Sequence, residues 1–361
     1  MAAVVSVSRF SAFAAILRGP RPDRKQVSIA MAALGFAALI RITGFASDAG
    51  PAQDPPRAAR LANLFLRQPL SPRVTAATDG PTRGTCVMAL ARNGKLSVGF
   101  EDPRRDVMVS LWACDLYNAS RDPDSTQLVG RARLSARSIF LSGNYALEPG
   151  TIMTASRYLA THTSAPGDPY ARLDMPNYSV CTKNQYRLYG QQTKTISPGV
   201  YCSGIEVTGG ATLNLKPGTY ILDRGDFAVS GDSKVNGAGV TLILTSRNGL
   251  NYGTVDIRSG STIRISAPVS GATAGIPGIA IWVDEHAPAA GATIEGGNAQ
   301  SIDGAVYLPS RRVRYSGGSP SGTRCTQLVA LAIAFTGNSY FRHDCTGTGV
   351  SDPEEPPFLL E

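Results

Sequence analysis

Carboxylates are the residues of this sequence best suited to chemistry. Four aspartates follow or interrupt short apolar segments: Asp223 and Asp226 in YILDRGDF, Asp256 in VDIR and Asp284 after IAIWV. Hydrolysis of a glycosidic bond needs two carboxyl groups about 5–9.5 Å apart, one acting as an acid and the other as a nucleophile or base. If the four side chains converge in one cleft, the protein is a carbohydrate-active enzyme or a glycan-binding module.

Other catalytic and metal-binding patterns are weak. Asp284, Glu285 and His286 could form an acid/base or metal group, but a single His in a loop rich in Gly, Pro and Ala is typical of a solvated turn. The sequence has no C-x-x-C pair, no G-x-S-x-G elbow beside a His/Asp pair and no phosphate-binding loop. We therefore predict no catalytic residue, no metal, no cofactor and no enzymatic activity.

An internal repeat indicates which elements position these side chains. Residues 205–222 (IEVTGGATLNLKPGTYIL) align without a gap with residues 227–244 (FAVSGDSKVNGAGVTLIL), and the phrase returns as VDIRSGSTIRI at 255–265. Weaker copies stand at 139–145, 313–319 and 333–339. Apolar residues alternate with polar ones, as in a strand with one buried face, and a Gly after each phrase permits a sharp bend.

Such units bury their apolar rows by stacking. We predict an all-β fold, a parallel β-helix (β-solenoid), right-handed by default from strand twist. Rows such as Ile205, Val207, Leu213 and Leu215 would fill its interior. An antiparallel sandwich is the alternative. In the repeat alignment Thr245 takes the place of Asp223 and Asn248 that of Asp226, so no ladder of carboxylates forms and these aspartates are expected to serve turns.

The cysteines favour an oxidising compartment. All six follow residue 83 and their number is even: Cys86, Cys114, Cys181, Cys202, Cys325 and Cys345. Of fifteen connectivities, nearest-neighbour pairing (Cys86–Cys114, Cys181–Cys202, Cys325–Cys345) closes local loops and is our prediction, with free buried thiols as the alternative. The first and last pairs would then cap the two ends of the stack.

The amino-terminal region has the features of an export signal. Fourteen uncharged residues run from Val27 to Ile40 after a basic flank. Gly44-Phe45-Ala46 then supplies the small-x-small pattern of a cleavage site. The length of the uncharged segment suits a secretory h-region, and counting Arg41 as a snorkelling residue extends it to a membrane span over 27–46. A buried helix of a soluble protein is the alternative. Domain boundaries follow as a cytoplasmic flank (1–26), the anchor (27–46), a Pro-rich tether (47–83), the β-helix (84–346) and an acidic, Pro-containing tail (347–361).

The charge distribution argues against a nucleic-acid partner. The net charge of the chain is +8, but the first 75 residues hold ten basic and three acidic side chains, which leaves the body nearly neutral. Arg311, Arg312 and Arg314 form the only basic cluster of the body. A nucleic-acid binder would usually carry a basic stripe on its folded part.

The sequence resembles the TadG-like proteins of bacterial tight-adherence (Tad/Flp) pilus systems. The resemblance rests on Arg24-Lys25, the apolar segment and Asp48, and on the phrases CVMAL at 86–90, PGVYCSGI at 198–205 and CTQLVA at 325–330. It implies a non-enzymatic component of the cell envelope that is anchored in the inner membrane or exported. Its partners would be other pilus-assembly or envelope proteins, or a surface glycan.

Overall fold

A computed structural model describes residues 3–6, 84–99 and 106–354 of this protein. The predicted anchor, including Val27, Ile40, Arg41 and Ala46, lies outside the described residues, as does the tether. Strand β1 (Ala3–Ser6) pairs antiparallel with β9 (Ile152–Ala160). The rest of the description concerns residues 84–354.

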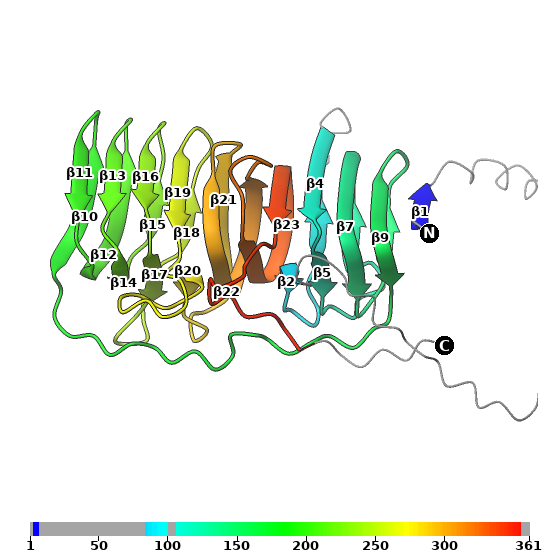
Figure 1. The fold of residues 1–361 in the computed structure, drawn as a ribbon, viewed down its shortest axis with the longest axis horizontal. Coiled ribbons are helices and arrows are strands. Elements are labelled where there is room, and N and C mark those ends of the chain that lie inside the picture. The colour runs from blue at the N-terminus through cyan, green and yellow to red at the C-terminus, as the bar shows by residue number, and fades with distance from the viewer. Residues whose placement is uncertain (1–2, 7–83, 100–105, 355–361) are drawn as a thin grey trace, which may run out of the picture. The chain divides into compact units, whose positions relative to one another are not determined.

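These residues form a parallel β-solenoid of about 11 turns, with no helix within the described ranges (Figure 1). The predicted all-β parallel stack is confirmed. Each turn contributes strands to three faces. The first face contains β14, β17 and β20, the second β15, β18 and β21, and the third β13, β16 and β19.

The stack consists of two blocks of sequence. The C-terminal block contains β10 (Lys183–Tyr189), β11 (Thr193–Ile196), β12 (Gly199–Thr208), β13 (Thr212–Leu215), β14 (Gly218–Asp223), β15 (Phe227–Val229), β16 (Lys234–Gly237), β17 (Val240–Thr245), β18 (Val255–Ile257), β19 (Thr262–Ser266), β20 (Ile279–Val283), β21 (Ala290–Gly297), β22 (Ser301–Gly317) and β23 (Thr326–Arg342). The N-terminal block contains β2 (Thr85–Ala89), β3 (Leu96–Val98), β4 (Asp106–Trp112), β5 (Asp115–Asn118), β6 (Thr126–Leu128), β7 (Arg131–Leu141), β8 (Tyr145–Leu147) and β9.

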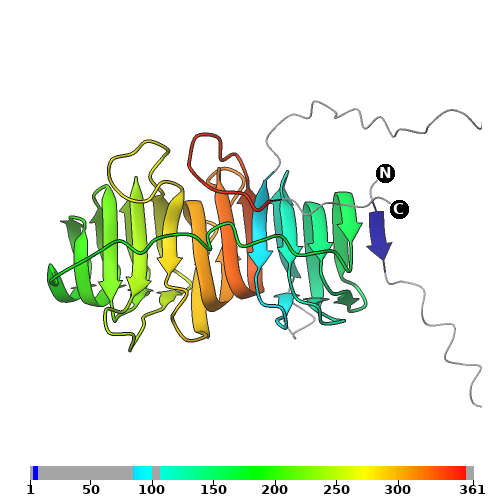
Figure 2. The same cartoon turned by 90° about the horizontal axis from the view of Figure 1, so that it is seen from below.

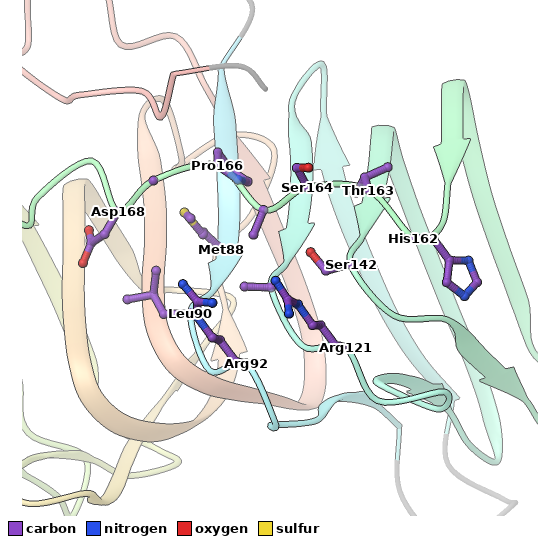
Figure 3. A pocket seen from close by; sticks show the side chains of 13 residues that line it. Met88, Leu90, Arg92, Arg121, Ser142, His162, Thr163, Ser164, Pro166 and Asp168 are labelled. Atoms are coloured by element: carbon purple, nitrogen blue, oxygen red, sulfur yellow. The ribbon is translucent and has the colours of Figure 1, made fainter. Parts of the chain in front are cut away.

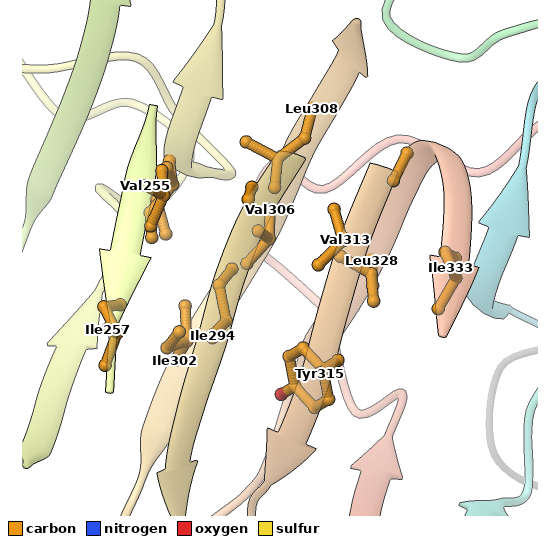
Figure 4. Close-up of a cluster of buried hydrophobic side chains, with 14 of the residues drawn as sticks. Val255, Ile257, Ile294, Ile302, Val306, Leu308, Val313, Tyr315, Leu328 and Ile333 are labelled. Atoms are coloured by element: carbon orange, nitrogen blue, oxygen red, sulfur yellow. The ribbon is translucent and has the colours of Figure 1, made fainter. Parts of the chain in front are cut away.

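The sequence repeat corresponds to the strand pairing of the C-terminal block: residues aligned in the repeat are paired on neighbouring turns. Ile205 pairs with Phe227 and Leu213 with Val235, as the ungapped alignment requires. On the second and third faces buried and partly exposed residues alternate, because one side of each strand faces the interior. The inward side chains form continuous apolar columns, seen for Val255, Ile257, Ile294 and their neighbours in Figure 4.

The turns do not stack in chain order. The last strand of the C-terminal block, β23, pairs in parallel with β2, β3 and β4 of the N-terminal block. The first block of the sequence therefore continues the stack that the second block begins. Among residues 84–354 the outer ends are β9 at one extreme and the turn of β10 and β11 at the other (Figure 1).

The joint between the blocks is closely packed. Tyr315, Phe335 and Phe341 are buried there, with the rings of Tyr315 and Phe341 5.0 Å apart. Gly84 lies against the ring of His343, so that a Cβ at this position would overlap the imidazole. The backbone N–H of Thr85, the first residue of β2, donates to Oδ1 of Asp352. This hydrogen bond joins the N-terminal block to the segment that follows β23.

Residues 161–182 form a strap that returns from β9 to β10 along the length of the stack (Figure 2). It lies on the outer side of the first face, where Tyr170, Leu173, Met175 and Tyr178 pack against a second apolar cluster that includes Trp282. This cover explains why β17 and β20 are buried on both sides. It also explains why strands of the first face have continuous apolar sequences instead of alternating ones.

The three predicted disulfides are present, Cys86–Cys114, Cys181–Cys202 and Cys325–Cys345, and the described residues contain no free cysteine. The prediction that the first and last pairs cap the stack is wrong. Cys86 and Cys325 begin turns on the two sides of the joint, because the blocks meet in the middle of the stack. Only Cys181–Cys202 lies beside an outer end, where the strap enters β10.

Candidate functional site

Asp223 is fully buried at the end of β14 and acts as a structural acceptor. Its Oδ1 accepts from the backbone N–H of Arg247 at 2.9 Å and its Oδ2 from Nε of the same residue at 2.6 Å. Arg224 adds a second guanidinium, and the hydroxyl of Tyr178 in the strap donates to Oδ1 at 3.3 Å. Burial raises the pKa of Asp223, but the hydrogen bonds and charge of Arg247 outweigh burial and hold the pKa below its ordinary value. This carboxylate therefore ties the strap and a loop to the first face.

Both carboxylate oxygens of Asp284 likewise accept hydrogen bonds from other residues of the chain. One carboxylate oxygen accepts from Oγ1 of Thr245 at 2.6 Å, and the other accepts from the backbone N–H of His286 at 2.9 Å. Nδ1 of His286 lies 3.0 Å from that second oxygen, and the hydrogen bond to Asp284 raises the pKa of the imidazole. Glu285 completes a group whose ligand atoms lie within 4.8 Å of one another. The hydrogen bonds of a turn account for this arrangement without a metal.

The four aspartates occupy three different places. Asp223 pairs in register with Thr245, which bonds Asp284, so these two carboxylates share one column of the first face, two turns apart. Asp226 follows the bend to the second face and accepts from the backbone N–H of Thr254. Asp256 lies on the second face itself, paired with Arg258. The structure therefore does not gather the four into one group.

The bend beside Asp226 depends on glycine. A Cβ added to Gly225 would meet the backbone of Ser203, and one added to Gly253 would meet the carbonyl of Gly225. The backbones of successive turns thus touch at this corner. The triplet Arg224-Gly225-Asp226 is explained by this close approach. Arg311 of the basic cluster is likewise structural, since its guanidinium is buried and donates to the carbonyls of Gly253 and Pro288.

A pocket of about 560 Å³ opens between the strap and the N-terminal block (Figure 3). None of the four aspartates lines it. Its walls come from successive turns of the first face and from the beginning of the strap: Met88, Leu90, Arg92, Ala119, Arg121, Ser142, His162, Thr163, Ser164, Ala165, Pro166, Gly167 and Asp168. Its volume falls within the range typical of small-molecule sites.

Two arginines dominate the electrostatics of this pocket. The backbone N–H of Arg121 donates to the carbonyl of Arg92 at 2.9 Å, so the two residues occupy equivalent positions on neighbouring turns. Both side chains are exposed, and neither guanidinium has a hydrogen-bond or carboxylate partner within the described part of the chain. Asp168, at the opposite end of the pocket from His162 (Figure 3), already accepts from the hydroxyl of Tyr307 and the backbone N–H of Tyr170. The pocket thus presents positive charge to solvent.

The remaining walls are apolar or hydroxylated. Met88, Leu90 and Ala119 form the apolar part. Oγ of Ser142 is buried and has no hydrogen-bond partner among the described residues, although a buried hydroxyl normally has one. The hydroxyl of Thr163 donates to the carbonyl of Leu141 and holds the strap in place. The arrangement can accept an anionic ligand that also offers hydroxyl groups.

The residues that line this pocket form no recognisable sequence motif. One signal was available: the register that pairs Ala89 with Asn118 also places Arg92 beside Arg121, because both arginines follow their strands at the same distance. This alignment lies in the block without an obvious repeat. The strap that completes the pocket has no counterpart in the repeat at all.

The chain was compared with family models, curated proteins and solved structures, and none of them matched. The compartment is indicated by chemistry, since three disulfides suggest an oxidising, periplasmic or extracellular environment. Within the ranges that the structure describes, no helix has both the length and the apolar character required to cross a membrane.

Proposed function

We propose that this protein is a non-enzymatic structural or interaction component of the cell envelope. It would resemble the TadG-like proteins of Flp pilus systems and act in pilus assembly or in surface adherence. Residues 27–46 would anchor it in the inner membrane or direct its export, and the solenoid would lie in the periplasm or outside the cell. Its partners would be other envelope or pilus-assembly proteins.

The observation that carries this proposal is the set of three disulfides in a rigid, repetitive body. Paired cysteines persist where thiols are not kept reduced, which agrees with an export signal in the preceding sequence. The partners of Asp223 and Asp284 support a structural role as well, because both carboxylates are engaged in bonds that hold the strap and a turn.

Strand β1 bears on the topology. A span at 27–46 would keep residues 3–6 on the cytoplasmic side, whereas pairing of β1 with β9 requires both on the same side. Cleavage near Ala46 would remove β1 altogether. The pairing of β1 with β9 and an exported solenoid are therefore alternative states of the chain under this proposal.

Fractionation of a tagged chain tests the proposal. We expect a membrane-associated or exported protein whose six cysteines resist alkylation until a reductant is added. A variant lacking residues 27–46 is the matched control and should remain in the cytoplasm with alkylatable thiols. Deletion of the gene should reduce surface adherence or pili, and only the full-length chain should restore them. Recovery of the full-length wild-type chain in the soluble cytoplasm, or unchanged adherence after deletion, would contradict the proposal.

A second candidate function is glycan binding on the same scaffold. It is favoured by one observation, the basic and hydroxylated pocket beneath the strap. For the related hypothesis of a carbohydrate-active enzyme, Asp223, Asp226, Asp256 and Asp284 would have to act together, and their positions on different elements argue against a shared cleft.

A further inference from the structure

We infer that the pocket between the strap and the N-terminal block binds a short acidic saccharide, with Arg92 and Arg121 contacting its carboxylate groups. This inference rests on the second candidate function, glycan binding, and names its site and its ligand class. It does not depend on a role in pilus assembly.

The charge arrangement favours an anion. Arg92 and Arg121 stand on neighbouring turns, which are about 4.8 Å apart in a parallel sheet. Like charges on neighbouring turns repel, and neither guanidinium forms an ion pair within the described part of the chain. Asp168 is held by the backbone N–H of Tyr170 and the hydroxyl of Tyr307, and its single negative charge offsets at most one of the two guanidinium charges. An external carboxylate would form charge-assisted hydrogen bonds with either guanidinium.

The uncharged walls favour a sugar over a bare inorganic anion. The Oγ of Ser142 is buried in the pocket wall and has no partner among the described residues, and rotation of this side chain towards the pocket would let a ligand hydroxyl provide one. Leu90, which is only partly buried, offers an apolar surface that suits the C–H face of a sugar ring, whereas Met88 and Ala119 are buried. Figure 3 shows Leu90 and Ser142 on the same side of the strap as the two arginines.

The direction of the pocket favours a chain with a repeated charge. Its walls come from successive turns, β2 with Met88, the turn after β5 with Arg121 and the turn after β7 with Ser142. The two guanidiniums repeat along this direction with the period of the solenoid. A uronic-acid oligosaccharide carries one carboxylate on every sugar and so matches both the repeat and the hydroxyl-bearing walls.

Direct binding measurements on the purified full-length chain test the inference. The probe is the trimer of galacturonate, and its methyl ester is the matched ligand without charge. We expect the trimer to bind with an affinity that falls as salt increases, and we expect the ester to bind at least about tenfold more weakly. Arg92→Gln and Arg121→Gln should each weaken binding of the trimer about tenfold, and Ser142→Ala should weaken it by less.

Arg133→Gln is the control variant, because Arg133 is an exposed arginine on the third face of the same block. It should leave binding unchanged, and all variants should keep the thermal midpoint of the wild type. Equal binding of trimer and ester, or equal competition by inorganic sulfate, overturns the ligand class. Unchanged binding to the double variant R92Q/R121Q overturns the site but leaves glycan binding standing, whereas absence of any saccharide binding removes both.

Discussion

The two blocks of the solenoid share a cross-section but differ in how their sequences encode it. In the C-terminal block, β13 and β16 follow one another in an ungapped register, and the repeat is visible in the sequence. In the N-terminal block no repeat of comparable clarity is visible in the sequence, although its strands also stack in a parallel register, as β4 does on β7. Both blocks nevertheless place apolar side chains in continuous columns. A turn is therefore defined by its inward column and its register, and a recognisable repeat is not required.

The N-terminal block contains buried polar contacts, as the C-terminal block does at Asp223 and Asp284. Asp115 is buried and pairs with Arg137, and the side-chain amide of Asn118 donates to Thr126 at 2.9 Å. Its first turn also stacks directly on β23 of the other block. The comparison thus raises a measurable question, whether the irregular block is stable without the regular one.

Phe335→Ala should have the largest effect. Phe335 is fully buried at the joint, where its ring lies 5.9 Å from that of Phe341, and truncation of a buried Phe costs about 3–5 kcal/mol. We expect the lost free energy of unfolding to appear as faster hydrogen exchange in the N-terminal block. Val229→Ala, in the middle of the regular block, is the control. Equal exchange in both blocks of the Phe335 variant would show that the blocks do not depend on the joint.

Replacing Cys325 and Cys345 together by serine should rank second. The disulfide closes 20 residues beside the joint, and its loss should cost about 2–4 kcal/mol. Because the joint lies in the middle of the stack, limited proteolysis should first open β23 and β2, while β9 stays protected. Replacement of Cys181 and Cys202 instead should open the end at β10. First cleavage at β9 in the former variant would contradict the described order of the turns.

Asp223→Asn tests the attachment of the strap to the regular block. Loss of charge-assisted hydrogen bonds should cost about 1.5–3 kcal/mol at neutral pH. The pKa of Asp223 is lower in the folded protein than in the unfolded one, so its contribution is complete above about pH 4, the unfolded value, and is lost as the pH falls through the folded value. The thermal midpoints of wild type and variant should therefore converge in acid. A difference that persists at pH 2 would assign the effect to packing.

Tyr170→Phe should have the smallest effect. The hydroxyl donates to Oε1 of Gln327 at 2.5 Å and accepts from the backbone N–H of Ser351, so it joins the strap to the joint and to the C-terminal segment. Loss of these bonds should cost about 1 kcal/mol in chemical unfolding. Tyr189→Phe, at an exposed ring on β10, is the control and should be neutral. A neutral Tyr170 variant would mean that the strap is held by its apolar contacts alone.

The sequence predicts the structure of a single turn better than the order in which the turns stack. Alternation and the offset of 22 between Ile205 and Phe227 lead to the parallel solenoid, and neighbouring cysteines lead to the disulfides. The order of the blocks was not predictable, because parallel pairing of Val87 with Leu328 leaves no local mark in either segment. The strap had one signal, since an apolar run such as IAIWV needs a cover on its outer side.

The candidate site was less accessible to prediction. The sequence offers Asp223 and Asp284 as candidate catalytic carboxylates, but both accept hydrogen bonds from other residues of the chain. Arg92 and Arg121 belong to no motif in the sequence. They are recognised as a pair only because the strand register places them on adjacent turns beneath the strap. A pocket built from separate turns and a returning segment depends on tertiary structure more than on any motif.

The joint also sets the order in which the molecule can fold. Residues near Thr85 emerge early in synthesis, yet the partners that cover them, such as Asp352, lie 267 positions later. Contacts over such separations form slowly, because the loop between them must be closed first. The regular C-terminal block can assemble by adding one turn to the next. It then serves as the template on which the N-terminal block, although synthesised first, packs last. A chain interrupted before β23 would leave the N-terminal block with an open edge, and such edges recruit other chains.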